Sequence, residues 1–160
     1  MSDDADQSAA GSPESVAGSV VFLADVRLLR ALSTILRTAV DLQRDAARVI
    51  DACLEPGGKT ADLARLGGRV TSGYFRLREQ LRSMPDHPLV REVDALVNYH
   101  QQIVEQAMLF GYRGFDAGRE KVLRGWSDRL GAPAQRLRDV YVEVQRRLAN
   151  REYQDGERPG

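Results

Sequence analysis

The sequence predicts an all-α protein, specifically a four-helix, up-down-up-down bundle with a long first helix and a fourth helix kinked at a proline. Three observations lead to this fold class. Four segments carry apolar residues at three- and four-residue steps, which place those residues on one face of a helix. Short stretches containing proline or glycine separate the four segments. No segment alternates apolar and polar residues as a half-buried strand does.

The first predicted helix spans residues 18–54 and ends at Glu55-Pro56-Gly57-Gly58, where proline removes a backbone donor and glycine frees the backbone. At a rise of about 1.5 Å per residue, this helix is roughly 50 Å long. Arginines occupy the side opposite its apolar stripe. The stripe itself consists of Leu28, Leu32, Ile35, Ala39, Leu42, Ala46, Val49 and Cys53.

The second predicted helix spans residues 61–83 and stops before Pro85. Its interior contains Gly67, Gly68 and Gly73, each of which costs about 1 kcal/mol relative to alanine. We therefore expect these glycines to allow another part of the chain to approach closely.

The third predicted helix spans residues 88–112, with Asp86 or His87 as its N-cap. The fourth spans residues 117–150 and contains Gly131-Ala132-Pro133. Counting about 100° per residue, the apolar face after Pro133 stays in phase with the face before it. This continuity favours one bent helix over two separate helices.

The ends of the chain differ from this central region in composition. Residues 1–17 are rich in Ser, Asp and Ala and are predicted to be a disordered acidic tail. Residues 18–150 form the predicted bundle, and residues 151–160 a frayed polar tail. Residues 19–150 carry 21 basic and 16 acidic groups, so the body is mildly basic although the whole chain has a formal net charge of zero.

The first and fourth predicted helices are longer than the other two and should extend past them at one end of the bundle. Two helices cannot bury each other's apolar faces fully, and an exposed apolar patch indicates an interface. We expect this end to form a homodimer or to dock a helical protein partner; the alternative is that the fourth helix folds back at Pro133 and covers it. The predicted interface residues are Val20, Val21, Phe22, Leu23, Val26, Val140, Tyr141, Val144 and Leu148.

Phe75 is a second predicted interface residue, because it falls off the apolar stripe of the second helix on the side of Gly68. Three arginines, Arg65, Arg69 and Arg76, share the face of that helix opposite its stripe. Such a face is a possible anion-binding surface that could contact nucleic-acid phosphates.

His100 lies in the middle of the apolar stripe of the third helix. Levelling the helices by their lengths places it near Gln43, Gly73 or Tyr74, and Trp126. We expect His100 to be a buried polar residue that hydrogen-bonds with Gln43, rather than a general base or a metal ligand. The other histidine, His87, is not at helical spacing from His100, and Val97 stands where a Glu-x-x-His pattern needs glutamate, so no metal site and no cofactor are predicted.

Arg82 and His87 are separated by four residues. This spacing resembles the motif of the HEPN family of helical ribonucleases, in which a histidine follows an arginine after four to six residues. The resemblance implies ribonuclease activity with these two residues at the active site. Pro85 within the spacer and the serine after the arginine depart from the usual motif.

The function favoured by the sequence is that of a non-enzymatic scaffold, adaptor or regulatory partner acting through protein contacts. The alternatives are a nucleic-acid-associated protein that uses the arginines of the second predicted helix and, less favoured, a HEPN-like ribonuclease. The longest uncharged run, ten residues, is too short to span a bilayer. Together with a single cysteine and an acidic N-terminus, it predicts a cytoplasmic protein without membrane association.

Overall fold

The computed structural model describes residues 13–55, 60–112 and 117–157, with side chains described in these ranges except at positions 13–22, 60, 112, 119, 122–123 and 126–130. Four helices account for the described chain: α1 (Pro13–Leu54), α2 (Thr60–Arg82), α3 (Pro88–Tyr112) and α4 (Ala117–Gly156). The described ranges contain no strand. The predicted all-α four-helix bundle is therefore confirmed.

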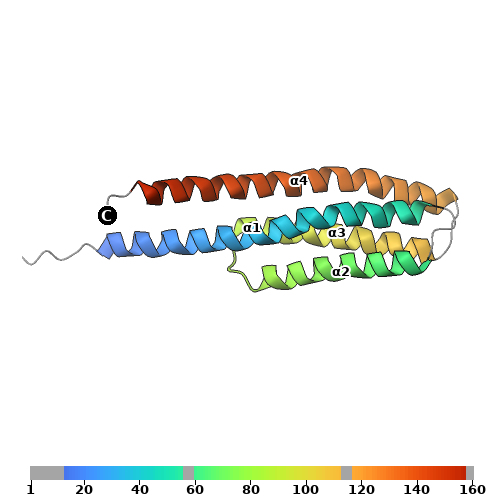
Figure 1. Ribbon diagram of the computed structural model, residues 1–160, viewed down its shortest axis with the longest axis horizontal. Helices are drawn as coiled ribbons and strands as arrows, with labels where there is room; N and C mark the ends of the chain where they lie inside the picture. Colours follow the sequence, from blue (N-terminus) through green and yellow to red (C-terminus); the bar gives the residue numbers. More distant parts are fainter. Residues whose placement is uncertain (1–12, 56–59, 113–116, 158–160) are drawn as a thin grey trace, which may run out of the picture.

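Successive helices run in opposite directions along the long axis of the molecule (Figure 1). α1 packs against each of the other three helices, and α3 packs against both α2 and α4. In the described parts of the chain, α2 and α4 do not pack against each other. The α1–α3 pair therefore forms the centre of the bundle, with α2 and α4 on opposite sides of it.

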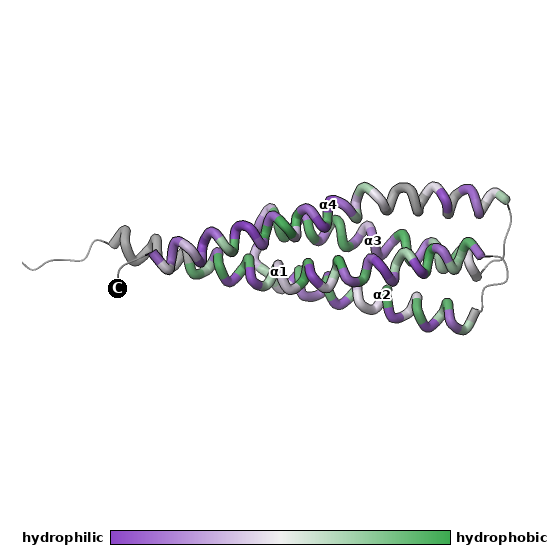
Figure 2. Tube along the Cα trace, turned by 45° about the horizontal axis from the view of Figure 1, so that its top comes forward, coloured by the Kyte–Doolittle hydropathy of each residue, from purple (hydrophilic) through white to green (hydrophobic). Residues whose placement is uncertain are grey.

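The hydrophobic core follows the predicted stripes of the helices, and hydrophobic and hydrophilic residues alternate along each helix in Figure 2. Its largest fully buried side chains include Leu32 and Leu36 of α1, Tyr74 of α2, His100 of α3 and Leu137 of α4. Burial of apolar area at about 25 cal/mol per Å² is the main force that holds such helices together. His100 places two polar ring nitrogens in this core, and buried polar atoms need hydrogen-bond partners.

Polar contacts spread along both helices define the register of α4 against α1. Arg138 contacts Gln43, Gln145 contacts Ser33, and Arg151 contacts Asp25. The sequence-based levelling instead placed Gln43 opposite Trp126, whose side chain is not described. α4 is therefore displaced by about two helical turns from its predicted position along the bundle axis.

Both long helices extend further than predicted at their ends. α1 begins at Pro13, where the fixed φ of proline suits the first turn, and not at residue 18. α4 continues to Gly156 and includes residues predicted to fray. Residues 1–12 lie outside the described part of the chain. α4 passes through Pro133 as one helix and does not fold back there, while the predicted kink at Pro133 stays a prediction.

The glycines of α2 provide a test of local packing. A Cβ atom at Gly67 would collide with the Met108 side chain, and one at Gly73 would lie 2.9 Å from Cδ1 of Leu42. These two glycines therefore accommodate side chains of neighbouring helices. A Cβ atom at Gly68 would meet nothing within 4 Å, so close packing does not require glycine there.

Gly68→Ala is therefore expected to raise the free energy of unfolding by about 1 kcal/mol, because alanine has the higher helix propensity and no clash opposes it. Gly73→Ala is the matched control on the same helix, and its gain should be cancelled by displacement of Leu42. Chemical denaturation of both variants measures the difference. Equal effects of the two substitutions would contradict the packing described for Gly73.

Candidate functional site

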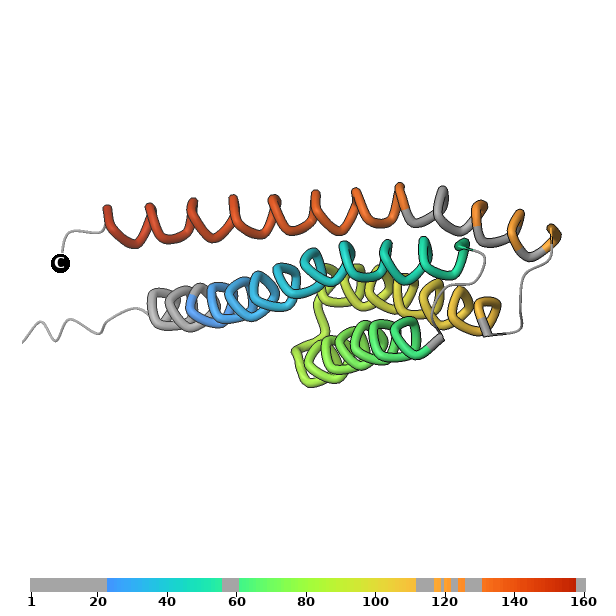
Figure 3. The backbone as a smooth tube through the Cα atoms, turned by 45° about the vertical axis from the view of Figure 1, so that its right-hand side comes forward, coloured from blue at the N-terminus to red at the C-terminus, as the bar shows by residue number. Residues whose placement is uncertain are grey.

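Among the described residues, the end of the bundle at the start of α1 and the end of α4 is formed by these two helices alone. Both helices continue past the turn between α2 and α3 in Figures 1 and 3. We call this region the overhang and define its described side chains as residues 23–27 of α1 and 150–156 of α4. Two ion pairs join its helices. Arg151 contacts Asp25 at 3.1 Å, and Arg30, which follows the overhang segment of α1, contacts Glu152 at 3.4 Å.

The overhang exposes some large apolar side chains but fewer than predicted. Leu23 is 53% exposed and Tyr153 is 68% exposed, whereas Val26 packs partly against the core. Backbone helix extends over Val20, Val21 and Phe22, but their side chains lie outside the described set. Charged and amide residues occupy much of the remaining overhang surface, so it is a mixed surface and not a continuous apolar patch.

Three residues of α4 predicted to be exposed at this end belong to the core instead. Val140 and Val144 are completely buried, Leu148 is 8% exposed, and Tyr141 packs partly against the core. The displacement of α4 along the axis is the physical reason, because it brings these residues to the level at which α3 still covers them. Val140, Val144 and Leu148 are therefore unavailable to a partner while the bundle is intact, whereas Tyr141 keeps part of its surface exposed.

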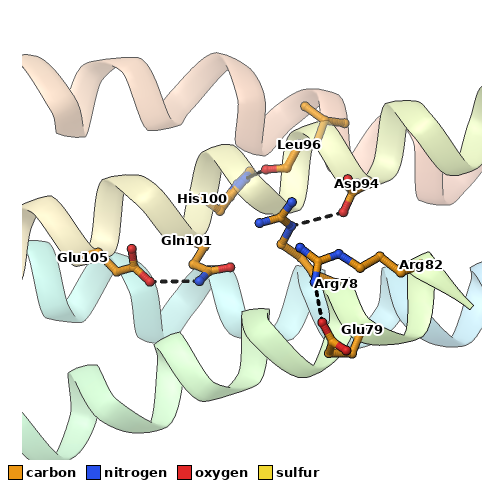
Figure 4. Close-up of polar contacts among 8 residues, drawn as sticks. All are labelled: Arg78, Glu79, Arg82, Asp94, Leu96, His100, Gln101 and Glu105. Carbon is orange, nitrogen blue, oxygen red and sulfur yellow. Dashed lines mark hydrogen bonds and ion pairs between the residues drawn. The ribbon is translucent and has the colours of Figure 1, made fainter.

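Phe75 is 54% exposed and lies at a shallow groove between α2 and α3. The groove has a volume of about 350 Å³ and is also lined by Thr71, Arg76, Gln101 and Glu105. Gln101 donates to Glu105, as Figure 4 shows, while its own buried Oε1 has no hydrogen-bond partner among the described residues. This groove is therefore a second described surface with an exposed aromatic side chain.

His100 and Gln43 form the buried polar centre of the bundle. Gln43 Nε2 lies 3.2 Å from His100 Nε2 and donates to the Ala134 carbonyl at 3.1 Å. Arg138 Nη1 donates to Gln43 Oε1 at 3.1 Å. A single glutamine on α1 therefore links α3 to α4, and each of its amide atoms is used. The sequence pointed to the His100–Gln43 pair, but it gave no signal for Arg138.

The protonation of His100 follows from its partners. Its Nδ1 lies 2.7 Å from the Leu96 carbonyl, which can only accept, so Nδ1 carries the hydrogen (Figure 4). Nε2 is then the acceptor for the Gln43 amide. Burial lowers the pKa of His100 below 6.5, the positive charge of Arg138 lowers it further, and the Leu96 hydrogen bond opposes both. The arrangement holds a neutral imidazole with both nitrogens satisfied, which is suited to structure and not to proton transfer.

Tyr74 packs against this centre, with its ring centroid 5.9 Å from that of His100. Its side chain is fully buried, and its hydroxyl has no hydrogen-bond partner in the described part of the protein. Burial and the negative charge of Asp45 both raise the pKa of Tyr74, which keeps the hydroxyl neutral. The site therefore contains a desolvated polar group without a hydrogen-bond partner among the described residues.

Tyr74→Phe is expected to raise the free energy of unfolding by about 1 kcal/mol, because it removes an unsatisfied buried hydroxyl without changing the ring. Tyr99→Phe, at a half-buried ring that also contacts His100, is the matched control and should change stability by less than about 0.5 kcal/mol. Urea denaturation provides the measurement. A clear loss of stability in Tyr74→Phe would indicate that the hydroxyl is satisfied in solution.

The arginine face of α2 is only partly neutralised. Arg65 pairs with Asp62 at 3.4 Å, with both side chains mostly exposed. No described carboxylate forms an ion pair with Arg69 or Arg76, although Arg76 Nε donates to the Ser72 carbonyl. The face thus offers two exposed guanidinium groups two turns apart on one helix.

The two residues of the HEPN-like spacing have other partners. Arg82 pairs with Glu79 within α2, as Figure 4 shows. His87 Nδ1 accepts a hydrogen bond from the Leu89 N–H at 3.1 Å and so caps the start of α3. Each residue has a local structural role, and no described contact joins them.

Metal-binding, membrane-spanning and thiol features are absent or inactive in the part of the chain that the structure describes. It contains no group of three or more His, Cys, Asp or Glu side chains that could hold a metal ion. None of the described helices combines the length and apolar character needed to cross a membrane. Burial raises the pKa of the Cys53 thiol to about 11, which keeps the thiol protonated and unreactive.

Comparison with protein-family models, with curated proteins and with solved structures found no match to this chain. The candidate surfaces therefore rest on the geometry alone. They are the overhang, the Phe75 groove and the arginine face of α2.

Proposed function

We propose that the protein acts through protein contacts at the overhang, as a cytoplasmic scaffold, adaptor or regulatory partner without catalysis of its own, and that its first partner is a second copy of the chain. The observation that carries this proposal is the extension of two helices past the other two (Figure 1). An antiparallel helix pair can gain further apolar burial by adding two more helices.

The composition of the overhang supports this assignment. Leu23 and Tyr153 present large apolar surface to solvent on its two helices. A two-fold arrangement of two overhangs would build a four-helix layer from identical pairs, as isologous dimers do. The polar groups around Leu23 and Tyr153 would then form the rim of the interface.

The mass of the protein in solution tests this function. Light scattering coupled to size exclusion at micromolar concentration should give a dimer for the native chain and a monomer for Leu23→Asp. Leu109→Asp is the control, because Leu109 is 43% exposed on α3 near the opposite end of the bundle. A monomeric native protein, or equal dissociation by both substitutions, would overturn the homodimer.

Nucleic-acid association through α2 is the second candidate, because Arg69 and Arg76 are exposed without a described carboxylate partner. Retention on heparin that falls with salt, and that is lost when Arg65, Arg69 and Arg76 are changed to glutamate, would support it. A pull-down from the native host with and without nuclease separates the two candidates. A protein partner that survives nuclease supports the overhang, and recovery that needs nucleic acid supports the arginine face.

A HEPN-like ribonuclease is the least favoured alternative, because Arg82 and His87 both have structural partners. Incubation with labelled RNA tests it directly. Cleavage by the native protein that His87→Ala abolishes would replace the non-enzymatic proposal with this one.

A further inference from the structure

A crevice lies at the base of the overhang, where α1 and α4 continue past the start of α3. It has a volume of about 420 Å³, which is within the size range of small-molecule sites. Three parts of the chain contribute side chains: Asp25 from α1, His87 from the start of α3, and Arg147, Asn150, Arg151 and Gln154 from α4. Two leucines add apolar wall.

Hydrogen-bond donors predominate among these side chains. The His87 Nδ1 accepts from the Leu89 N–H, so a neutral His87 ring carries its hydrogen on Nε2 and offers a donor there. Arg147 carries five N–H donors, and its contact with Glu143 at 2.6 Å involves only the Nη2 atom. The amides of Asn150 and Gln154 add two NH₂ groups.

The charges that face the crevice favour an anion. Two arginines and one carboxylate line it. Asp25 is that carboxylate, and it contacts Arg151 at 3.1 Å. Arg147 is 47% exposed and its side chain reaches both Glu143 and the crevice. Guanidinium groups bind carboxylates and phosphates through paired hydrogen bonds, which suits this donor set.

We propose that this crevice binds the carboxylate or phosphate group of a small molecule, with Arg147 and the His87 Nε2–H as its principal donors. The leucines would contact the apolar part of such a ligand. The crevice shares Asp25, Asn150, Arg151 and Gln154 with the overhang, but a monomer has every residue that lines it, so anion binding does not require the proposed dimer.

Titration of ¹⁵N-labelled full-length protein with inorganic phosphate, and separately with acetate, tests the proposal at constant ionic strength. Constant ionic strength removes the general screening of surface charge. At least one of the two anions should give saturable shifts, with a dissociation constant of about 1–10 mM. The affected amides should cluster at the start of α3 and at residues 147–154 of α4. The anion that saturates identifies the chemical class.

Three variants separate the crevice from general attraction to a basic protein. Arg147→Gln should weaken binding by about tenfold or more, because it removes a charged donor. His87→Asp should do the same while it retains an oxygen that can cap α3. Arg146→Gln is the matched control, since this neighbouring arginine is exposed and does not line the crevice, and binding should stay within about twofold of the native value.

The amide spectrum also reports whether each variant remains folded. No saturable shift with either anion overturns the proposal, as does an equal loss of binding in Arg146→Gln and Arg147→Gln. Both results can be distinguished from failure of the overhang dimer, which is read from molecular mass and not from anion binding.

Discussion

Gln43→Leu is expected to lower the free energy of unfolding by about 3 kcal/mol, although leucine is close to glutamine in size. Gln43 supplies a donor to His100 and to the Ala134 carbonyl, and it accepts from Arg138. Leucine leaves the Nε2 of a fully buried His100 without a partner, and a buried polar group without a partner retains its full desolvation cost. Equilibrium denaturation in urea measures the effect.

The matched control is Gln102→Leu on the exposed face of α3, which should change the free energy of unfolding by less than about 0.5 kcal/mol. The double variant Gln43→Leu, His100→Leu replaces both partners by apolar groups. Its loss of unfolding free energy should therefore be smaller than the sum of the losses in Gln43→Leu and His100→Leu. Additive losses would show that the two side chains do not interact in solution.

Acidification is expected to destabilise the protein through His100. Its pKa in the folded state is lowered below the ordinary value of 6.5. Between the folded-state pKa and pH 6.5, the unfolded chain therefore binds a proton that the folded chain excludes. This contribution to stability is complete above pH 6.5 and is lost as the pH falls through the folded pKa, by up to about 1.4 kcal/mol per pH unit. A second hydrogen on the ring would also face the NH₂ group of Gln43, where two donors oppose each other.

Unfolding free energies of native protein and His100→Leu, measured from roughly pH 5 to pH 7.5, isolate this contribution. Subtracting the two curves removes most of the dependence due to carboxylates. The native protein should lose more stability at low pH than His100→Leu does. His87→Gln, which changes the other histidine, should keep the native slope, and a native slope in His100→Leu would contradict the assignment.

The helices themselves are largely predictable from the sequence. The bounds of α2 and α3 lie within one residue of those that the apolar spacing and the flanking prolines predict. The start of α1 and the end of α4 are harder to predict, because residues 13–17 and 151–156 contain no apolar stripe. Their helical state follows from continuation of an existing helix and from Pro13 at the first position.

The relative positions of the helices are harder to predict than their bounds. Periodicity assigns faces, but it does not determine how far one helix slides along another. His100 meets Gln43 as levelling suggests, since short turns fix α2 and α3 against α1. The register of α4 depends on Arg138, Gln145 and Arg151, and periodicity cannot choose their partners on α1. For this reason, levelling the helices by their lengths predicts the wrong level for Val140 and Val144.

The same slide explains why the crevice has no sequence signature. Asp25, His87 and Arg147 are far apart in the chain and converge only when α4 takes its actual register. Within the crevice, Asp25 of α1 pairs with Arg151 of α4 at 3.1 Å.

Intermolecular distances between spin labels test the overhang most directly. Ala24 on α1 and Ala117 at the start of α4 are both exposed, and each can be changed singly to cysteine, while the buried Cys53 stays unlabelled because burial keeps its thiol protonated. Pulsed dipolar spectroscopy on a singly labelled protein reports only label pairs in different chains. The overhang dimer predicts a short, well-defined distance for the label at position 24 and a much longer one at position 117. The absence of a dipolar signal at position 24, or a distance between labels that is shorter at position 117 than at position 24, would contradict the overhang dimer.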